Sequence, residues 1–514
     1  MSVNVDHLTR HAEEIGDRIA VIDDREGSSV HKVDYFTFNA QVNALANGLL
    51  SLGAQPGSHI AWWGNNSVDS LMTIHAIRKS GGVSIPIPYR STSEEALYLL
   101  GVADVEILVI EARYVPVVEQ VYKQLPSLKH VITFGASESL EGFKAMHEIL
   151  GVSSTPVSEA NFISTQRMIF TSGTTGKPKG AIRKVGGEAN QFGALLELLG
   201  WDVMENLIFL TTGPLYHSGP SGFALRSQLV GATVVTQYAF DPEDWLRLVS
   251  THRVSATFSA PTPIRRVTSL PEEIKAQYDV SSLRSLIANA APWTMKLKRA
   301  YLRDFRDDSL WEVYGSTELS VCTVLAPEDQ LRKPGSCGVP APGVEIQLVD
   351  ESGMTITESD TPGELYARSN ALFDTYYKSH DKYLDDHRDG YQTVGDIAYV
   401  DDEGYYFICD RKKDMIITGG VNVYPAEVEN VLDDHPQVVE VAVLGIPDEE
   451  WGEAVCAVVV PLERLEEGDM TEFARNRLSG PKVPKRIFFY PELPKTGSGK
   501  VLKRELREQI LRDL

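Results

Sequence analysis

One segment of the sequence combines the residue types that can hold phosphate groups. The ten residues from Thr171 to Gly180 contain three glycines, four hydroxyl side chains and two lysines, and they follow the apolar pair Ile169-Phe170. Glycine lets backbone N–H groups approach an anion, hydroxyl groups donate further hydrogen bonds, and lysine adds positive charge. The segment therefore predicts a polyphosphate cradle, although clusters of Gly, Ser, Thr and Pro are also typical of surface loops.

The spacing of this segment excludes a Walker-type phosphate loop. That motif requires G-x-x-x-x-G-K-[ST], whereas Gly173 is followed five positions later by Pro178. Gly499-Lys500 fails as well, because Pro494 stands at the first glycine position and Val501 stands where Ser or Thr is needed. A P-loop kinase or ATPase, which would release ADP, is therefore disfavoured.

Five further segments follow the first one in a recognisable order. They are Tyr314-Gly315-Ser316-Thr317-Glu318, Gly395-Asp396, Asp410-Arg411-Lys412-Lys413-Asp414, Gly419-Gly420 and Lys495-Thr496-Gly497-Ser498-Gly499-Lys500. Together the six segments resemble the adenylate-forming superfamily, which contains acyl-CoA synthetases, luciferases and the adenylation domains of peptide synthetases. The resemblance extends from about residue 20 to the C-terminus and is closest to the acyl-CoA synthetases.

The resemblance implies a reaction in two steps. A carboxylic acid and ATP give acyl-AMP and pyrophosphate, and CoA, the co-substrate, then takes the acyl group to give a thioester and AMP. Bringing one anion against another requires cations at the site. The resemblance therefore implies Mg²⁺ bound with ATP and held by Glu318.

The resemblance also implies a role for particular residues around the nucleotide. Thr317 donates its hydroxyl to the α-phosphate, Tyr314 offers a flat face to adenine, and Asp396 accepts the ribose hydroxyls, with Arg411 as a second contact. Tyr314 could equally be a core aromatic residue with a satisfied hydroxyl. The ATP- and AMP-binding residues implied in this way are Thr171, Ser172, Gly173, Thr174, Thr175, Gly176, Lys177, Asn289, Ala290, Ala291, Tyr314, Gly315, Ser316, Asp396 and Arg411.

One departure from the family pattern lies beside the predicted adenine site. Asn289 stands in the segment 288–292, where glycine is commoner in the family. Its amide could contact the base or narrow the acyl pocket, and the sequence leaves both readings open.

Three features near the C-terminus bear on catalysis. The resemblance implies that Lys500 bridges the carboxylate and the α-phosphate and leaves when the small domain rotates, with Asp410 as the hinge. Without the resemblance, Lys500 would be read as an ordinary exposed lysine. Gly419 and Gly420 match the loop that lines the pantetheine tunnel in CoA-using members, and a tight turn is the alternative.

The acid-binding side is less well defined. His217 resembles the residue that gates the carboxylate pocket, although a lone histidine is more often packed or at the surface. Small residues, among them Ser218, Gly219 and Gly222, favour a long or ring-bearing acid over acetate. No basic residue lies inside the predicted pocket segments to pair with a second carboxylate, and Arg265 and Arg266 are the nearest candidates, so a diacid is disfavoured.

The elements that position these residues alternate between strand and helix. Apolar runs at 58–63, 83–87, 105–110, 207–210, 233–236, 256–259 and 285–288 alternate with helical stretches, which predicts parallel α/β sheets. After Gly335 the pattern changes to short strands, which predicts a small β-rich subdomain. We therefore expect an α/β fold with a large N-terminal adenylating domain, residues 1–409, followed by a small mobile α+β domain, residues 410–514.

Composition restricts the class of protein and its partners. The 514 residues carry 49 basic and 71 acidic side chains, a net charge of −22, which disfavours nucleic acid as a partner. The four cysteines form no C-x-x-C pair and no apolar run spans a bilayer. We expect a reduced, cytoplasmic protein without transmembrane segments, with peripheral membrane contact and a homodimer left open.

The resemblance therefore implies an ATP-dependent acyl-CoA synthetase. Its partners are ATP, CoA and an apolar carboxylic acid, either a medium- or long-chain fatty acid or a cyclic, aromatic or steroid-type acid. One alternative is an adenylating enzyme that loads a separate carrier protein, and another is a non-catalytic acyl or nucleotide sensor with this fold. The joint presence of Glu318 and Lys500 argues against a sensor, which needs neither a metal ligand nor a mobile lysine.

Overall fold

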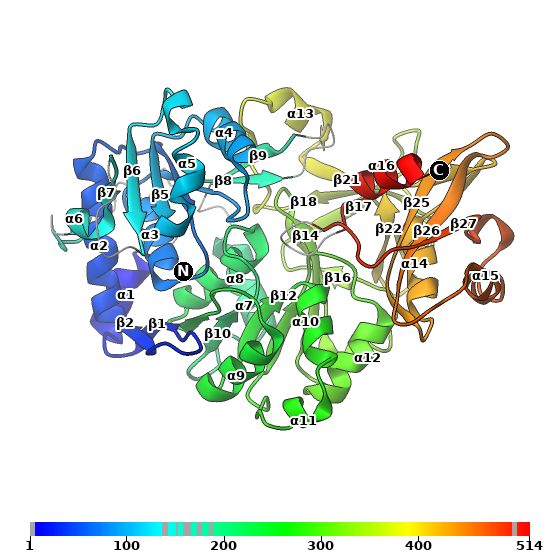
Figure 1. The fold of residues 1–514 in the computed structure, drawn as a ribbon, viewed down its shortest axis with the longest axis horizontal. Coiled ribbons are helices and arrows are strands. Elements are labelled where there is room, and N and C mark those ends of the chain that lie inside the picture. Colours follow the sequence, from blue (N-terminus) through cyan, green and yellow to red (C-terminus); the bar gives the residue numbers. More distant parts are fainter. Residues whose placement is uncertain are drawn as a thin grey trace.

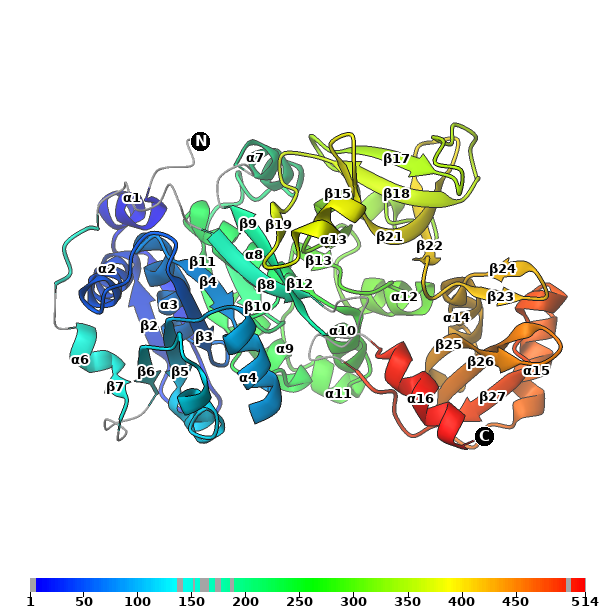
Figure 2. The same cartoon turned by 90° about the horizontal axis from the view of Figure 1, so that it is seen from above.

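The computed structural model describes residues 6–135, 142–150, 153–157, 166–171, 177–184, 189–495 and 501–513. Two large sheets, here called sheets A and B, lie beside two smaller ones, sheets C and D (Figures 1 and 2). The C-terminal segment, coloured orange to red, lies at one end of the molecule beside α10 and α12 (Figure 2).

Sheet A has the strand order β16-β15-β14-β13-β12-β10-β11-β1-β2, with a parallel interior from β14 to β1. The interior strands are buried on both faces, which explains why they read as continuous apolar runs in the sequence. The strands are β1 Ile19–Asp23, β2 His31–Asp34, β10 Ile208–Thr211, β11 Thr233–Thr236, β12 Ala256–Ser259, β13 Ser285–Ala288, β14 Leu310–Ser316, β15 Ser320–Leu325 and β16 Val339–Pro340.

Sheet B has the strand order β19-β9-β8-β4-β3-β5-β6-β7 and is parallel from β8 to β7. Its antiparallel edge, β8-β9-β19, brings a distant segment of the chain next to the predicted phosphate segment. The strands are β3 His59–Trp63, β4 Val83–Pro86, β5 Ile107–Glu111, β6 His130–Phe134, β7 Lys144–Ala145, β8 Gln166–Thr171, β9 Lys179–Lys184 and β19 Thr375–Tyr376.

Helices cover both faces of the two large sheets. One core joins residues of α2, α3 and α8 to residues of both sheets, so these helices lie between the sheets. A second core packs α9, α10 and α12 on the other face of sheet A, and a third packs α4 on the other face of sheet B. The helices of this part are α1 His7–Glu14, α2 Tyr35–Ser51, α3 Val68–Lys79, α4 Ser93–Val102, α5 Val115–Val118, α6 Met146–Leu150, α7 Ala189–Leu198, α8 Ser218–Leu229, α9 Pro242–His252, α10 Pro261–Thr268, α11 Glu272–Lys275 and α12 Met295–Asp304.

Sheet C is the predicted β-rich subdomain. It is antiparallel, with the order β17-β18-β21-β20 and with β22 paired to β21. Its elements are β17 Glu345–Val349, β18 Gly363–Arg368, α13 His380–Asp385, β20 His387–Arg388, β21 Tyr391–Val400 and β22 Tyr406–Arg411. The boundary predicted between residues 409 and 410 falls within β22.

Sheet D forms the C-terminal unit. One core packs α14 and α15 on one face of the sheet, and another packs α16 on the opposite face through Leu506 and Ile510. The elements are β23 Ile416–Thr418, β24 Val421–Val423, α14 Pro425–Asp433, β25 Val438–Asp448, β26 Gly452–Pro461, α15 Glu467–Arg475, β27 Arg486–Phe489 and α16 Lys503–Asp513. The predicted architecture, a large α/β part with a β subdomain and a small α+β unit, is confirmed.

Two basic side chains of the large part contact the C-terminal unit. Arg265 of α10 donates to Val439 O at 2.7 Å, and its guanidinium lies 3.5 Å from the Glu440 carboxylate. Lys296 of α12 donates to Val438 O at 2.7 Å. In the described part of the chain, no helix is both long enough and apolar enough to cross a membrane.

Two buried histidines make the fold sensitive to mild acid. His7 is 8% exposed and His75 is 5% exposed, and burial lowers the pKa of each ring to about 4. Unfolding returns both rings to a pKa near 6.5, so the unfolded chain binds more protons and stability falls as the pH drops from about 6.5 towards 4. Each ring contributes about 1.4 kcal/mol per pH unit within that window.

Urea unfolding at pH 7.5 and pH 5.5 tests this expectation. The free energy of unfolding should fall by about 3 kcal/mol between the two conditions from these two rings, and by about 1.4 kcal/mol more from His217, because burial also lowers the pKa of that ring to about 4. In a His75→Gln variant the fall should be smaller by about 1.4 kcal/mol, because Gln228 Oε1, which lies 2.8 Å from His75 Nε2, can accept from the new amide while one titrating ring is gone. A free energy that is flat or rising over this range would contradict the burial of neutral rings.

Candidate active site

Tyr314, Asp396 and Arg411 meet at the end of β14. The Tyr314 hydroxyl donates to Asp396 Oδ2 at 2.6 Å, and Arg411 Nε lies 3.3 Å from Asp396 Oδ1. The pairing of β21 with β22 places Asp396 directly opposite Arg411. Burial, and secondly the charge of Asp396, raises the pKa of Tyr314 well above its usual value, so its hydroxyl remains a donor. Three residues predicted to surround the nucleoside are thus brought together.

The turn between β14 and β15 presents Thr317 and Glu318. A Cβ on Gly315 would lie 1.9 Å from Ser320 O, so only glycine fits there. The Ser316 hydroxyl accepts from Leu319 N at 3.0 Å and closes the turn. The Thr317 hydroxyl oxygen lies 2.9 Å from that of Ser218, the first residue of α8. The turn is therefore anchored to the helix that carries the predicted acid-binding residues.

The Glu318 side chain is 7% exposed and is held by a distant tyrosine. The Tyr376 hydroxyl donates to Glu318 Oε1 at 2.9 Å, and burial, followed by the charge of Glu318, raises the pKa of Tyr376 far above its usual range. In the part of the chain that the structure describes, Glu318 Oε2 accepts no hydrogen bond. One carboxylate oxygen is thus engaged and the other is left for a ligand.

The donor set of this turn fits Mg²⁺. Mg²⁺ is bound in proteins through one or two carboxylates together with waters and substrate phosphates, rather than by an all-protein cage. Glu318 supplies one carboxylate and Thr317 a neighbouring hydroxyl. Within the described ranges no group of three or more His, Cys, Asp or Glu side chains could hold a metal ion.

The predicted phosphate segment is described at its two ends. Thr171 ends β8 and pairs with Lys179 of β9. Ser172, Gly173, Thr174, Thr175 and Gly176 lie outside the described residues. Lys177 Nζ lies 5.3 Å from the ring centroid of Tyr98, and Lys179 Nζ lies 5.8 Å from that of Tyr376. Lys179, which the site prediction omitted, therefore lies near the tyrosine that holds Glu318.

Asn289 and its neighbours follow β13. The Asn289 amide nitrogen donates to Val313 O, in the strand that ends at Tyr314-Gly315-Ser316. Ala290 adopts a left-handed backbone with φ of 74°, and Ala291 follows it. The Asn289 amide nitrogen is therefore engaged with the backbone of β14, an arrangement that the sequence did not predict.

His217 lies directly before α8. Its ring packs against Tyr216 with 4.2 Å between centroids, and its buried Nε2 has no hydrogen-bond partner among the described residues. Burial lowers the pKa of His217 to about 4, so the ring is neutral at neutral pH. A neutral ring with an unpartnered nitrogen can contact a substrate without adding charge to the acid-binding side.

Neighbouring side chains fill the space next to two glycines of α8. A Cβ on Gly219 would lie 2.4 Å from the Phe258 ring, and one on Gly222 would lie 2.5 Å from Arg226 Nη1. The expected open volume beside these glycines is therefore partly occupied. Arg226 also places a guanidinium in this helix, whereas Arg265 is engaged with the C-terminal unit.

The hinge candidate Asp410 is tied to the start of α14. Its Oδ2 accepts from Ala426 N at 3.0 Å, and its Oδ1 accepts from Arg411 N at 2.7 Å. Burial raises the pKa of this carboxyl, and Lys503, with Nζ 4.0 Å away, partly opposes that shift. Asp410 thus connects the last strand of sheet C to the first helix of the C-terminal unit.

The remaining predicted residues lie in the C-terminal unit. Gly419 and Gly420 form the turn between β23 and β24 with φ of 57° and 79°, and Gly419 N donates to Trp451 O at 2.9 Å. The positive φ of both glycines fits a tight turn, which the sequence offered as the alternative, and their assignment to the pantetheine passage stays a prediction. Lys500 lies outside the described residues, between Lys495 and Val501, which form a backbone bridge.

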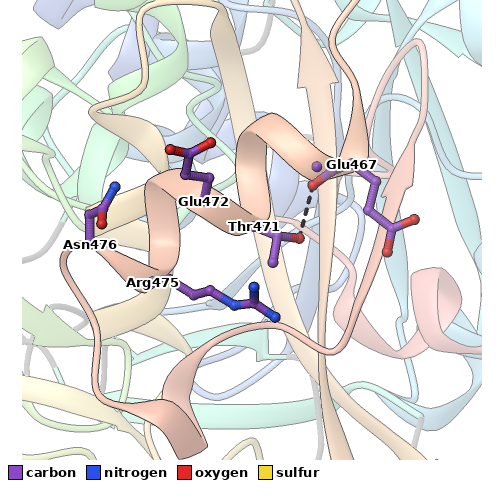
Figure 3. A pocket seen from close by; sticks show the side chains of 6 residues that line it. Glu467, Thr471, Glu472, Arg475 and Asn476 are labelled. Atoms are coloured by element: carbon purple, nitrogen blue, oxygen red, sulfur yellow. Dashed lines mark hydrogen bonds between the residues drawn. The ribbon is translucent and has the colours of Figure 1, made fainter.

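A surface hollow in the same unit lies apart from these residues. It is formed on α15, on the face of sheet D opposite α16, and the Thr471 hydroxyl there donates to Glu467 O at 2.9 Å (Figure 3). Its lining consists of Glu467, Gly468, Thr471, Glu472, Arg475 and Asn476. None of the residues predicted to act in catalysis or binding belongs to it.

Sequence reasoning missed several residues that shape the site. Arg183 of β9 donates to Thr317 O at 2.8 Å and to Ala371 O at 2.7 Å, and Phe373 N donates to Glu318 O at 2.8 Å. Lys179 could have been found, because it belongs to the predicted phosphate segment. Arg183 and Tyr376 carry no local signal that distinguishes them from other strand residues.

Comparison with known proteins agrees with this arrangement. A family model described as AMP-binding enzyme matches residues 8–377, and one described as AMP-binding enzyme C-terminal domain matches residues 427–500. An indoleacetate–CoA ligase of Aromatoleum aromaticum is 32% identical, with 93% of this chain and 94% of that protein covered. A feruloyl-CoA synthase of Amycolatopsis is 33% identical over the same shares. A long-chain-fatty-acid–CoA ligase of Mycobacterium tuberculosis is 30% identical, with 94% of both chains covered.

Solved structures extend the likeness to the whole fold. ATP-bound MatB of Rhodopseudomonas palustris is 26% identical and superposes with a TM-score of 0.86 over 99% of each chain. The amide bond synthetase McbA of Marinactinospora thermotolerans is also 26% identical, with a TM-score of 0.86 over 98% of this chain and 99% of that one. The chain therefore belongs to the AMP-binding enzymes of the adenylate-forming superfamily and, among them, to the AMP-forming acid:CoA ligase family.

Proposed function

We propose that the protein converts an apolar aromatic or fatty carboxylic acid into its CoA thioester through an acyl-AMP intermediate. The observation that carries the proposal is the convergence of Tyr314, Asp396 and Arg411 beside the turn of Thr317 and Glu318. The first three residues suit a nucleoside, and the turn beside them suits a metal ion bound to phosphates, so the two sets together suit ATP. We assign Tyr314 to adenine, and Asp396 and Arg411 to the ribose.

In the first step, an oxygen of the acid attacks the α-phosphorus and pyrophosphate leaves. Thr317 donates its hydroxyl to an α-phosphate oxygen, and Lys500 neutralises charge between the carboxylate and the phosphate. Glu318 and Thr317 would hold Mg²⁺, which supplies positive charge to the phosphate oxygens when bound. The segment from Thr171 to Lys177 would cradle the phosphates that leave.

In the second step, the CoA sulfur attacks the acyl carbonyl carbon and AMP leaves, while the thiol proton passes to solvent or to the AMP phosphate. We assign Gly419 and Gly420 to the pantetheine passage, since glycines let a ligand approach the backbone closely. The two steps need different groups at the same place, which a rotation of residues 410–514 about Asp410 would provide.

Two observations favour an apolar acid as the substrate: the acids for which relatives are named, and the side chains near the start of α8 in this chain. Curated relatives act on indoleacetate, ferulate and long-chain fatty acids by name, all of them acids with a large apolar part. In this chain, His217 directly before α8 is neutral, and the buried rings of Phe223 and Phe258 stack on each other, with Phe258 beside Gly219 of α8. An apolar acid is therefore favoured over a small polar one such as acetate.

A group other than CoA is a second candidate for the acceptor of the acyl group. McbA, a structural relative over nearly the whole chain, is named as an amide bond synthetase. An amine or a carrier protein in place of CoA would use the same first step and change only the second. Product analysis with each acceptor separates these possibilities from the thioester.

Pyrophosphate release over a panel of acids tests the proposed acid class. The panel contains an arylacetic acid, a cinnamic-type acid, fatty acids of eight to sixteen carbons, acetate and a dicarboxylic acid, each with ATP and Mg²⁺. We expect kcat/KM for the best aromatic or fatty acid to exceed that for acetate by about 100-fold or more. Equal rates for acetate and the apolar acids would overturn the acid class, and no release with any acid would support a non-catalytic sensor.

A further inference from the structure

We infer that Tyr376 is a positioning residue that holds the Glu318 carboxylate in the orientation required for Mg²⁺. The inference rests on the proposed function, in which Glu318 binds the metal. It adds a residue from a distant part of the chain to the machinery of the first step. The Tyr376 hydroxyl donates a hydrogen bond directly to Glu318, and among the described residues it has no other hydrogen-bond partner.

The hydrogen bond between the two residues is well placed. The Tyr376 hydroxyl lies 2.9 Å from Glu318 Oε1, and the two residues are 9% and 7% exposed. A phenol O–H donates to a carboxylate, and a hydrogen bond to a charged acceptor away from water is stronger than a neutral one. The bond therefore restricts rotation of the carboxylate and leaves Oε2 for a ligand.

Strand pairing and ring packing fix the tyrosine itself. Tyr376 lies in β19 and pairs with Ala181 of β9, the strand that follows the predicted phosphate segment. Its ring meets Phe373 edge-on at 4.8 Å, and Lys179 Nζ lies 5.8 Å from its centroid. The orientation of Glu318 is thus linked to the strand that begins at Lys179.

The backbone of the same two segments is joined independently of Tyr376. Phe373 N donates to Glu318 O at 2.8 Å, and Arg183 bridges Thr317 O and Ala371 O at 2.8 and 2.7 Å. The turn therefore keeps its place when the Tyr376 hydroxyl is removed. A Tyr376→Phe substitution should change the orientation of one side chain and little else.

Mg²⁺ is sensitive to such a change, because it requires near-ideal octahedral geometry. Partners that orient metal ligands typically contribute 10- to 100-fold to metal affinity. We expect Tyr376→Phe to weaken metal binding in the presence of nucleotide by about 10- to 100-fold. The KM for the acid should stay within about twofold, since the hydroxyl does not face the acid in this account.

The adjacent residue provides a matched control. The Tyr377 hydroxyl also donates to a carboxylate, Asp104 Oδ2, at 2.8 Å. Tyr377 directly follows β19, and its hydroxyl bonds Asp104 and not Glu318, so this second bond is separate from the metal ligand. Tyr377→Phe removes the same atom from a neighbouring residue and should leave metal affinity within about twofold of the wild-type value.

The experiment measures Mn²⁺ binding by electron paramagnetic resonance in the presence of an ATP analogue with a methylene bridge between the α- and β-phosphorus atoms. The readout needs no turnover. The full chain is compared with Tyr376→Phe, Tyr377→Phe and Glu318→Gln, and activity of the two tyrosine variants is titrated with Mg²⁺. We expect Tyr376→Phe to bind Mn²⁺ weakly and to regain kcat at high Mg²⁺, while Tyr377→Phe behaves as wild type.

Metal affinity of Tyr376→Phe within twofold of wild type would overturn the inference, and so would an equal loss in Tyr377→Phe. Wild-type affinity in Glu318→Gln would instead overturn the metal assignment in the proposed function. If Tyr376→Phe is too unstable to purify, Phe373→Leu tests the same claim, because it removes the edge contact that fixes the Tyr376 ring. That variant should weaken Mn²⁺ binding in the same direction, and unchanged binding would contradict the positioning role.

Discussion

Replacing Lys500 by alanine is expected to lower the rate of acyl-AMP formation by about three orders of magnitude while leaving thioester formation from pre-made acyl-AMP within a few-fold of wild type. The lysine neutralises charge where the acid approaches the α-phosphate, and that charge develops only in the first step. Single-turnover measurements, one with acid and ATP and one with synthetic acyl-AMP and CoA, separate the two rates.

Lys495 provides the control for this prediction. It lies at the start of the same segment, and its Nζ is 2.6 Å from both carboxylate oxygens of Glu440. Lys495→Ala should therefore remove the contact with Glu440 in the C-terminal unit and leave the rate of acyl-AMP formation close to the wild-type value. Equal losses in both half-reactions for Lys500→Ala would contradict a role of the lysine that is confined to acyl-AMP formation.

Glu318→Gln should lower the rate of the first step by about 100- to 1,000-fold, with little effect on the second. The substitution keeps the shape of the side chain but removes the negative charge that a cation needs. Pyrophosphate leaves only in the first step, so charge neutralisation on its oxygens matters only there. Rapid-quench measurement of acyl-AMP over a range of Mg²⁺ concentrations checks the expected loss.

Glu345→Gln is the matched control for Glu318→Gln. Glu345 also accepts a tyrosine hydroxyl, that of Tyr391 at 3.1 Å, but it is exposed in sheet C. The control should retain both rates within about twofold. If Glu318→Gln retained the wild-type rate at all Mg²⁺ concentrations, another group would have to hold the metal.

Elements buried on both sides could be predicted from the sequence with accurate bounds. The runs predicted at 233–236, 256–259 and 285–288 coincide with β11, β12 and β13. β14, by contrast, continues to Ser316 through the segment Tyr314-Gly315-Ser316, with an irregularity between Tyr314 and Gly315. Glycine and hydroxyl residues predict a turn there, but pairing with β15 keeps them in the sheet.

The candidate site could be predicted where its residues lie in recognisable segments. Tyr314, Asp396 and Arg411 were expected together and are found in contact. Tyr376 and Arg183 were not expected, because they reach the Thr317–Glu318 turn from 58 and 134 residues away in the sequence. Such contacts depend on the pairing of β9 with β19, which no local pattern indicates.

The central claim, activation of an acid through acyl-AMP followed by transfer to CoA, has a direct test. The purified protein is incubated with ATP, Mg²⁺ and pooled fatty, aromatic and steroid-type acids, with and without CoA, and the products are identified by mass. We predict one AMP and one acyl-CoA thioester per ATP consumed, with the thioester formed only when CoA is present. Formation of ADP, or of AMP without thioester for every acid in the pool, would contradict the account.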